Sequence, residues 1–192
     1  MTAGAADAAD TERKGQRTRR AILLAARRVF GEVGYERATI RTIAQAAGVD
    51  KSSVSQYFGT KENLFRESVH WTIPMDLVIA DTAEQTAANL ARGILSAWAT
   101  EPVSPMAVLL RASMTTEQAA ELLRSHITAQ VVDAMEDSVD APDARLRIAL
   151  AGSMLMGVAL QRYVLQLPDL CDASSEEIAR AVAPLVATLL TD

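Results

Sequence analysis

The sequence predicts an all-α protein with an N-terminal helix-turn-helix domain and a C-terminal helical domain. Apolar residues recur at steps of three and four along most of the chain, which is the spacing of one helix face, and no segment shows the two-residue alternation of a strand. A glycine turn joins two short helical segments between residues 39 and 58. The charge also changes sign: residues 13–66 carry twelve basic and four acidic side chains, whereas residues 71–192 carry seven and sixteen. We therefore expect a short arm at 1–12, a basic domain at 13–66 and an acidic domain at 67–192.

The composition is that of an ordinary globular protein. Of 192 residues, 49% are hydrophobic and 22% are charged, and no apolar run approaches the roughly 18 residues that span a bilayer. The N-terminus has acidic residues and lacks the apolar core of a signal peptide, so export is not expected. The single cysteine, Cys171, excludes an intramolecular disulfide and suits a reducing compartment. We expect a cytoplasmic protein without a membrane partner.

Residues 1–12 and residues 13–20 differ in charge. Residues 1–12 are small and acidic and have no periodicity, which predicts a disordered arm. A basic lead-in to the first helix follows, made of Arg13, Lys14, Arg17, Arg19 and Arg20. Such arms contact phosphates or enter a minor groove, and a solvated, charged helix start is the alternative.

The first helix is expected over residues 16–33, where Ile22, Ala26 and Phe30 share a face. Gly34 follows the last apolar position and is expected to end this helix. The apolar face predicts the core against which the next two helices pack.

Residues 39–58 match the helix-turn-helix pattern. Thr39 is a good N-cap for the first short helix, Gly48 is a good residue to end it, and Asp50 is a good N-cap for the second. Two such helices joined by a turn of three or four residues define the motif, and its second helix enters the major groove of DNA. An ordinary helical hairpin is the alternative.

The second helix carries polar side chains that can hydrogen-bond to phosphates or base edges. These are Lys51, Ser52, Ser53, Ser55, Gln56 and Tyr57. Because phosphate contacts supply most of the non-specific affinity for DNA, we expect the basic domain to bind double-stranded DNA. The acidic domain is expected to repel it. Gln56 can pair with adenine or simply be solvated.

The rest of the chain is expected to be helical. Thr60 caps a fourth helix, which Pro74 is expected to kink or end early. Further helices are expected over residues 76–99, 106–112, 115–137, 140–167 and 174–190. Capping boxes or a proline-containing start open three of them, at Thr115–Gln118, Asp140–Pro142 and Ser174–Glu177.

Residues 17–66 resemble the N-terminal domain of the TetR family of transcriptional regulators. The matching features, in the family's order, are Phe30, Gly34, Tyr35, Thr39, the IAQAAGV segment, Tyr57, Phe58 and the KENLF segment. So many ordered features over these fifty residues make the resemblance specific. It is weak after residue 70, where the family varies.

The resemblance implies particular DNA contacts. Thr39 and Lys61 match phosphate-contacting positions, and Arg41 matches a position at which some members place an arginine that reads guanine. Other matching contact positions are Lys51, Ser53 and Tyr57. The chain departs from the family's usual Gly, Leu and Tyr at Ser52, Val54 and Ser55, so the operator preference of other members does not carry over.

The resemblance also implies a homodimer held by a four-helix bundle, to which each subunit contributes its last two helices. Residues 146–164 are apolar nearly all round, and the last helix has a broad apolar stripe, so both need partners. The candidate interface residues are Leu150, Met154, Gly157, Leu160, Ile178, Val182, Leu185 and Leu189. Burial of both helices inside one subunit is the alternative.

Large, adaptable side chains in the C-terminal domain are candidates for binding a small-molecule effector, because methionine suits irregular pockets. The candidates are Trp71, Met75, Trp98, Met106, Arg111, Met114, Met154 and Tyr163. Each of them has an alternative role in the core or on the surface.

The sequence contains no catalytic or metal-binding pattern: it has no P-loop, GxSxG or HExxH motif, and His70 and His126 lack metal-ligand spacing. We therefore expect neither an enzyme nor a cofactor. The sequence predicts a homodimeric repressor that leaves a palindromic operator when a small molecule binds its C-terminal domain. One alternative is a ligand-independent DNA-binding protein whose C-terminal domain only dimerises. Another is a helical small-molecule binding protein with a vestigial DNA-binding domain.

Overall fold

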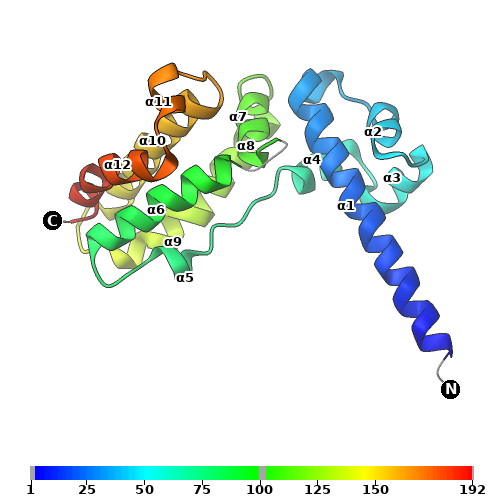
Figure 1. Cartoon of the computed structure of the whole chain (residues 1–192), viewed down its shortest axis with the longest axis horizontal. Coiled ribbons are helices and arrows are strands. Elements are labelled where there is room, and N and C mark those ends of the chain that lie inside the picture. The colour runs from blue at the N-terminus through cyan, green and yellow to red at the C-terminus, as the bar shows by residue number, and fades with distance from the viewer. Residues whose placement is uncertain (1–2, 100–102, 192) are drawn as a thin grey trace. The chain divides into compact units, whose positions relative to one another are not determined.

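The computed structural model describes residues 3–99 and 103–191 and divides into two compact units, Met1–His70 and Trp71–Asp192 (Figure 1). We call them the N-terminal unit and the C-terminal unit. Within the described ranges every regular element is helical, as the sequence predicts, and none is a strand. None of the helices in those ranges is both long enough and apolar enough to cross a membrane.

The N-terminal unit is built from short helices on one long one. Its elements are α1 (Ala3–Arg37), α2 (Ile40–Ala47), α3 (Lys51–Phe58) and α4 (Lys61–Ser68). The sequence predicts disorder over residues 1–12, whereas α1 begins at Ala3. Alanine is the best helix former, so this alanine-rich segment extends the helix that follows it. Gly34 breaks the helical backbone at φ 78°, as expected from its position after the apolar stripe.

Local capping defines the ends of the short helices. Thr39 caps α2 by accepting a hydrogen bond from the amide of Thr42, and Gly48 ends α2 in the left-handed conformation at φ 66°. Thr60 caps α4 in the same way as Thr39 caps α2. These predictions are confirmed. Asp50 holds the N-cap position of α3, but its side chain makes no capping hydrogen bond.

The core of the N-terminal unit joins α1 to the helix-turn-helix pair and to α4. Ile22 of α1, Ile43 of α2 and Val54 of α3 have no exposed surface. Phe30 of α1 packs edge-on against Phe65 of α4, with ring centroids 5.0 Å apart. The apolar stripe of α1 therefore packs against α2, as the sequence predicts, and also against α4, while α3 packs mainly on α2 and α4.

α4 ends at Ser68, well before Pro74, and residues 70–74 are not helical. Its last turn is fixed by Arg27 of α1, whose Nε donates a 2.8 Å hydrogen bond to the carbonyl of Ser68. Partial burial of the Arg27 guanidinium lowers its pKa. The chain therefore leaves the N-terminal unit in an extended form and not along a continuous helix.

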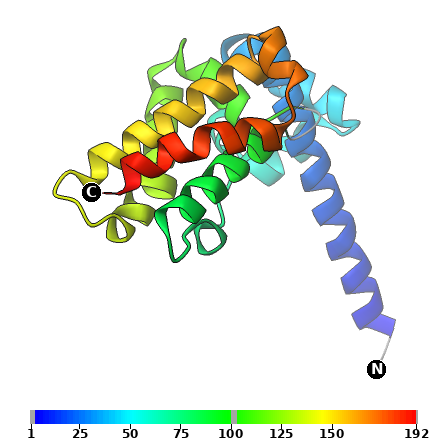
Figure 2. The ribbon, with the colours of Figure 1, turned by 60° about the vertical axis from the view of Figure 1, so that its left-hand side comes forward.

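The C-terminal unit contains the remaining helices. They are α5 (Met75–Val78), α6 (Ala83–Trp98), α7 (Pro105–Ser113), α8 (Glu117–Ile127), the π-helix η1 (Thr128–Val132), α9 (Asp133–Met135), the 3₁₀ helix η2 (Glu136–Ser138), α10 (Ala144–Tyr163), α11 (Pro168–Asp172) and α12 (Ser175–Leu190). Figure 2 shows α12 lying alongside α6 and α10, on which it packs.

Three boundaries in this unit differ from the prediction. The helix expected over 76–99 is interrupted at residues 79–82, because the Thr82 side chain caps α6 by accepting from the amide of Gln85. Thr116 and not Thr115 caps α8, and the Thr115 hydroxyl instead donates to the carbonyl of Ala112.

The helix expected over 140–167 begins at Ala144 and ends at Tyr163. Gln166, just beyond it, is in a left-handed conformation at φ 54°, which a helix cannot continue. The predicted capping box of the last helix is confirmed: Ser174 and Glu177 each accept a hydrogen bond from the other's backbone amide.

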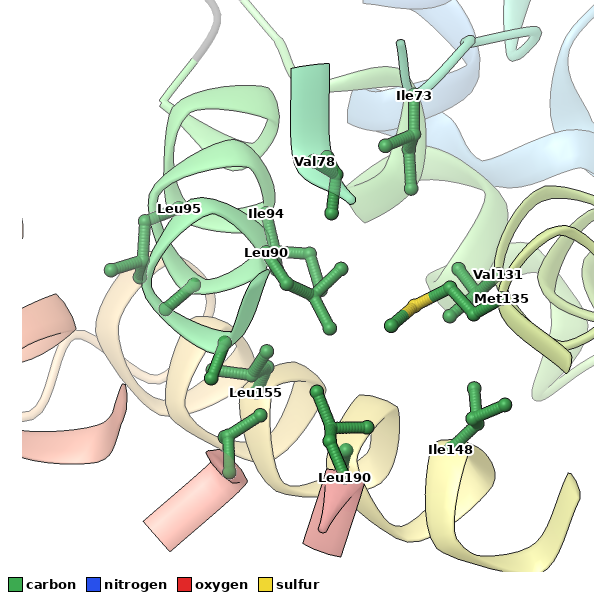
Figure 3. Close-up of a cluster of buried hydrophobic side chains, with 14 of the residues drawn as sticks. Ile73, Val78, Leu90, Ile94, Leu95, Val131, Met135, Ile148, Leu155 and Leu190 are labelled. Atoms are coloured by element: carbon green, nitrogen blue, oxygen red, sulfur yellow. The ribbon is translucent and has the colours of Figure 1, made fainter. Parts of the chain in front are cut away.

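Side chains from several helices form the core of the C-terminal unit. Figure 3 shows Leu90 of α6, Met135 of α9 and Ile148 of α10 pointing toward one another, and all three are fully buried. Trp98 at the end of α6 is also buried in this cluster, 2% exposed. A cavity lies beside this cluster, and several of its members line it.

Candidate nucleic-acid interface and effector cavity

The exposed polar face of α3 carries most of the residues predicted to contact DNA. Lys51, Ser52, Ser55, Gln56 and Tyr57 are exposed. Ser53 is half-buried on the same helix. Since Val54 and Phe58 are buried on the opposite side, the short helix is held by its apolar face and presents its polar face outward.

Thr39 and Arg41, at the start of α2, are also exposed. The Thr39 hydroxyl is engaged in the α2 cap, where it accepts a 3.1 Å hydrogen bond from the amide of Thr42. Arg41 forms no ion pair with any residue that the structure describes. Its guanidinium is therefore available for a bidentate contact to guanine.

Lys61, at the start of α4, is held by the N-terminal unit itself. Its Nζ lies 4.4 Å from the centre of the Tyr35 ring and donates a 3.3 Å hydrogen bond to the carbonyl of Glu36. The Tyr35 hydroxyl donates to Glu62, and burial followed by the charge of Glu62 raises the pKa of Tyr35 to about 12. This contact set fixes the direction of the Lys61 ammonium group at the N-terminus of α4, where anions are favoured.

α1 carries a basic face near its N-terminal end, within the segment predicted to lead into the first helix. Arg13, Arg17 and Arg20 line one shallow depression together with Gln16, which is the spacing of a single helix face. α1 also passes close to α3: a Cβ atom on Gly15 would lie 3.4 Å from the Tyr57 hydroxyl oxygen. Arg19 has a structural role instead, because it pairs with Glu67 and lies over the ring of Phe58.

A cavity of about 380 Å³ lies within the C-terminal unit. Its apolar wall includes Ile73, Ile94, Met106, Leu110, Ile148 and Met156. These residues come from the segment before α5 and from α6, α7 and α10, while η1 and the end of α8 close another side. A concave, mostly apolar space of this size is the usual form of a small-molecule site.

Several polar groups around the cavity have defined partners, whereas the Trp71 indole nitrogen, Nε1, is buried without a hydrogen-bond partner among the described residues. The Gln130 side-chain oxygen, on η1, accepts a 3.1 Å hydrogen bond from the amide of Ile73. The ring of His126 meets the ring of Trp71 edge-on, with centroids 4.7 Å apart. The Ser153 hydroxyl donates 2.8 Å to the carbonyl of Ala149. The cavity is thus bounded on one side by residues 71–73, which begin the C-terminal unit.

Two family comparisons cover most of the chain. Residues 22–68 match the family described as bacterial regulatory proteins, tetR family, and residues 84–190 match the tetracyclin repressor-like C-terminal domain. The chain belongs to the TetR family. Members of this family are transcriptional regulators and not enzymes, so the expectation that the chain is not an enzyme is confirmed.

Relatives of known description match over a short part of the chain. The HTH-type transcriptional repressor AcnR of Corynebacterium glutamicum is 46% identical over 52 residues, which is 27% of this chain and 28% of that protein. The HTH-type transcriptional dual regulator CecR of Shigella flexneri is 38% identical over 58 residues, covering 30% of this chain and 26% of its own length. The chain thus spans little more than a quarter of the length of these relatives.

Solved structures match over nearly the whole chain. A TetR-family regulator from Streptomyces coelicolor A3 has 29% identity and a TM-score of 0.63, over 91% of this chain and 95% of that one. NalD, the secondary repressor of the MexAB-OprM multidrug efflux pump in Pseudomonas aeruginosa, has 20% identity and a TM-score of 0.67, over 93% and 98%. The second of these shows the fold alone. Together they confirm the two-part, all-helical TetR architecture.

The structure brings only part of the predicted effector set to the cavity of this TetR-family chain. Trp71 and Met106 line it. Trp98 is buried in the core, while Met75, Met154 and Tyr163 pack partly buried against that core. Met114 is 71% exposed, Arg111 is exposed, and neither is among the residues that line the cavity.

Sequence reasoning did not select His126 and Gln130 as lining residues. The available signal was their spacing of four residues beside apolar Ile127 and Val131, which places two polar groups on one helix face that is otherwise apolar.

The candidate dimer residues on α10 and α12 have three kinds of environment. Leu150 and Leu185 are 48% and 56% exposed, and Met154, Val182 and Leu189 are half-buried. Ile178 is buried in the core, and Gly157 and Leu160 line the cavity. Leu146, one turn before Leu150, is also exposed and extends the same apolar face, although the sequence analysis did not select it.

Proposed function

We propose that this TetR-family chain is a cytoplasmic, homodimeric repressor that binds a pseudo-palindromic DNA operator and is released when a small molecule occupies the C-terminal cavity. The observation that carries the proposal is the pairing of an exposed polar recognition helix, α3, with a 380 Å³ apolar cavity in the other unit.

The DNA-binding part of the proposal rests on the N-terminal unit. α3 presents Lys51, Ser52 and Gln56 outward, and Arg41 extends from the adjacent helix α2. In a helix-turn-helix protein, such side chains reach base edges while the helix starts contact phosphates. Lys61 and Thr39 lie at helix starts and are therefore assigned to phosphate contacts.

The dimer part rests on the exposed leucines of α10 and α12. Leu146, Leu150 and Leu185 would cost solubility if left in water over a continuous face, and a second copy of the same two helices covers them. A dimer places its two recognition helices about 34–36 Å apart, in successive major grooves. We expect Leu150→Glu with Leu185→Glu to give monomers in sedimentation, with an unchanged helical circular dichroism spectrum.

Ligand response rests on the location of the cavity wall. Trp71 and Ile73 belong to the non-helical segment that follows α4, so a molecule in the cavity contacts the segment that continues directly from the DNA-binding unit. A ligand shifts the population toward whichever state it binds better, and the two affinities are linked reciprocally.

The test is a genomic selection for bound DNA with wild type, Arg41→Ala and Lys61→Ala. We expect a palindromic site for wild type. Arg41→Ala should relax the base preference at one position of each half-site. Lys61→Ala should instead weaken binding to all sequences and reduce the salt dependence of binding by about one phosphate contact. Wild type that enriches no sequence at physiological salt would overturn the proposal.

The second candidate is a ligand-independent dimeric DNA-binding protein. Because its C-terminal unit would have no ligand to accommodate, filling the cavity should leave its regulation unchanged. The size of the cavity favours the ligand-responsive function.

A further inference from the structure

We infer that the cavity binds an uncharged, largely apolar molecule that carries a hydrogen-bond-accepting oxygen, such as a medium-chain ketone, ester or lactone, and that it rejects carboxylates and amines. This inference rests on the proposed ligand response and names the chemistry of its ligand.

The first argument is the absence of a fixed counter-charge. No Asp, Glu, Lys or Arg is among the described residues that line the cavity, and His126 is their one titratable side chain. An ionised ligand would lose its hydration without gaining an ion pair, which costs several kcal/mol. An uncharged apolar molecule has no comparable desolvation cost, and burial of its apolar surface favours binding.

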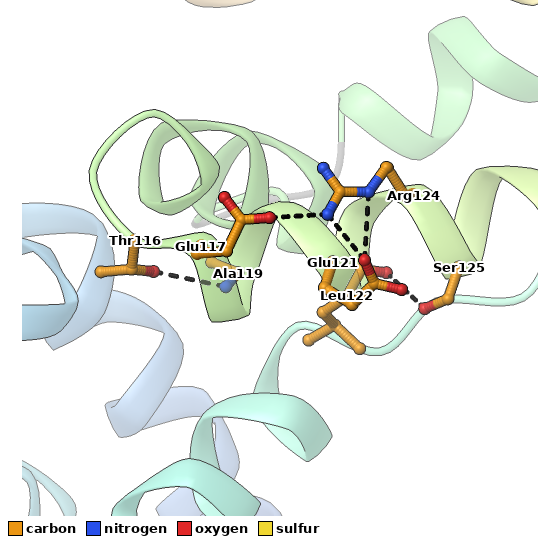
Figure 4. Close-up of polar contacts among 7 residues, drawn as sticks. All are labelled: Thr116, Glu117, Ala119, Glu121, Leu122, Arg124 and Ser125. Atoms are coloured by element: carbon orange, nitrogen blue, oxygen red, sulfur yellow. Dashed lines mark hydrogen bonds and ion pairs between the residues drawn. The ribbon is translucent and has the colours of Figure 1, made fainter.

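The second argument is that Arg124 and Arg162, each two residues from a lining residue, are already committed elsewhere. Arg124 on α8 donates to Glu121 at 2.6 Å and to Glu117 at 2.7 Å, on the exposed side of that helix (Figure 4). Arg162 at the end of α10 donates to the carbonyls of Leu170 and Ala173. Neither guanidinium lines the cavity, so neither serves as an anchor for an anion.

The third argument concerns the hydrogen-bond donors of the lining residues: the Trp71 Nε1–H, which has no hydrogen-bond partner among the described residues, and the side-chain nitrogen of Gln130. Because the Gln130 oxygen accepts from the Ile73 amide, its side-chain nitrogen is left as a donor, and Gln130 lines the cavity. The Ser153 hydroxyl hydrogen is directed to the carbonyl of Ala149. A ligand oxygen that only accepts, as in a ketone or ester, satisfies the Gln130 amide without needing a partner for a proton of its own.

The fourth argument is the shape of the wall. Met106 and Met156 are unbranched and flexible, so they adapt to an irregular apolar chain. Gly152 lines the same wall, and no atom lies within 4 Å of the position that its Cβ would take. There is therefore room beside α10 for the apolar part of the ligand.

The experiment compares decan-2-one with nonanoate, which has an oxygen anion in place of one methyl group, by calorimetric titration of the full-length protein. At about pH 8, where nonanoate is ionised, we expect saturable binding of the ketone and at least about 100-fold weaker binding of nonanoate. Equal affinity for the two, or no binding of the ketone up to its solubility limit, would overturn the inference.

Two pairs of variants locate the binding. Gly152→Leu fills the cavity and should abolish ketone binding, whereas Gly93→Leu, on α6 and outside the cavity, should retain it. Ser153→Arg places a cation at the exposed rim and should raise the affinity for nonanoate by about 10-fold or more, whereas Gln161→Arg, exposed on the same helix, should not. Ketone binding that survives Gly152→Leu would place the site elsewhere.

Binding and regulation are separated by measuring operator affinity with and without the ketone. Ketone binding that leaves operator affinity unchanged would disprove the proposed ligand response and leave the ligand class standing. Release of the operator by nonanoate as readily as by the ketone would support the response and overturn the ligand class.

Discussion

The interiors of the two units differ in how completely side chains fill them. In the N-terminal unit, the rings of Phe30, Tyr35 and Phe65 lie within 5.8 Å of one another, centroid to centroid, and the apolar faces of three helices close over α1. In the C-terminal unit, the buried cluster surrounds empty apolar volume of about 380 Å³. Empty volume costs stability, because the atoms around it lack packing partners.

This difference matches the tasks proposed for the two units. A surface that reads base edges needs side chains in fixed positions, and close packing supplies them. A cavity that admits a ligand needs volume that the ligand can fill and thereby stabilise. We therefore expect equivalent substitutions to have different and sometimes opposite effects in the two units.

The largest effect is expected for Phe30→Ala. Phe30 is 3% exposed and touches both Tyr35 and Phe65, so truncation leaves a void in a filled core and should lower the free energy of unfolding by about 3–5 kcal/mol. Urea unfolding followed by circular dichroism measures it. As the comparison, Met156→Ala on the cavity wall should cost under about 2 kcal/mol, because empty volume is already present there. Equal losses would contradict the difference in packing.

A glycine substitution in the N-terminal unit should destabilise. Gly48 ends α2 at φ 66°, where a Cβ atom clashes with the backbone, so Gly48→Ala should cost about 1–2 kcal/mol. Gly48→Asn is the control and should cost less, because asparagine tolerates this conformation. Thermal unfolding of the three proteins checks the order, and an alanine variant as stable as wild type would show that α2 can end differently.

A glycine substitution in the C-terminal unit should have the opposite sign. Gly152 lies within α10 in ordinary helical conformation with open space around it, so Gly152→Ala should stabilise by about 0.5–1 kcal/mol through helix propensity. Gly93→Ala on α6 should stabilise similarly, but only Gly152→Ala should also weaken ligand binding. Destabilisation by Gly152→Ala would mean that the wall of the cavity is tighter than its geometry indicates.

The smallest effect concerns pH. The pKa of Tyr35 is raised to about 12 in the folded protein, so the folded state holds this proton more tightly than the unfolded state. Its contribution to stability is complete below about pH 10 and is lost as pH rises toward 12. Urea midpoints at rising pH should therefore fall less steeply in Tyr35→Phe than in wild type. Parallel curves for the two proteins would contradict this role of Tyr35.

The parts of the fold that the sequence predicted correctly are those with local causes. Thr39, Thr60 and Ser174 each cap a helix through an amide three residues ahead, so the cap can be identified within four residues of sequence. The break at residues 79–82 is different. Thr82 caps α6 there through an amide three residues ahead, and Thr86 hydrogen-bonds to the backbone of Ala80, but the same residues also fit a continuous helix, so the local pattern does not decide between the two.

The candidate sites divide in the same way. The exposed face of α3 follows from the four-residue spacing of Val54 and Phe58, which places both apolar side chains on one side of a short helix and the polar residues on the other. The cavity gathers Trp71, Met106, His126 and Met156 from segments far apart in the sequence. Residue type alone therefore could not separate Met106, on its wall, from Met114, which is 71% exposed.

The π-helix at Thr128–Val132 has a consequence for insertions and deletions. Its hydrogen bonds span five residues instead of four, so this turn holds one residue more than an α-helical turn would. Removing one residue there would let α8 and α9 join as one regular helix, with the turns on either side keeping their relative orientation, because the deletion takes out the extra residue of the wide turn. Because this turn supplies Gln130, Val131 and Val132 to the cavity wall, a single-codon deletion in it would reshape the wall while leaving the helices on either side in place.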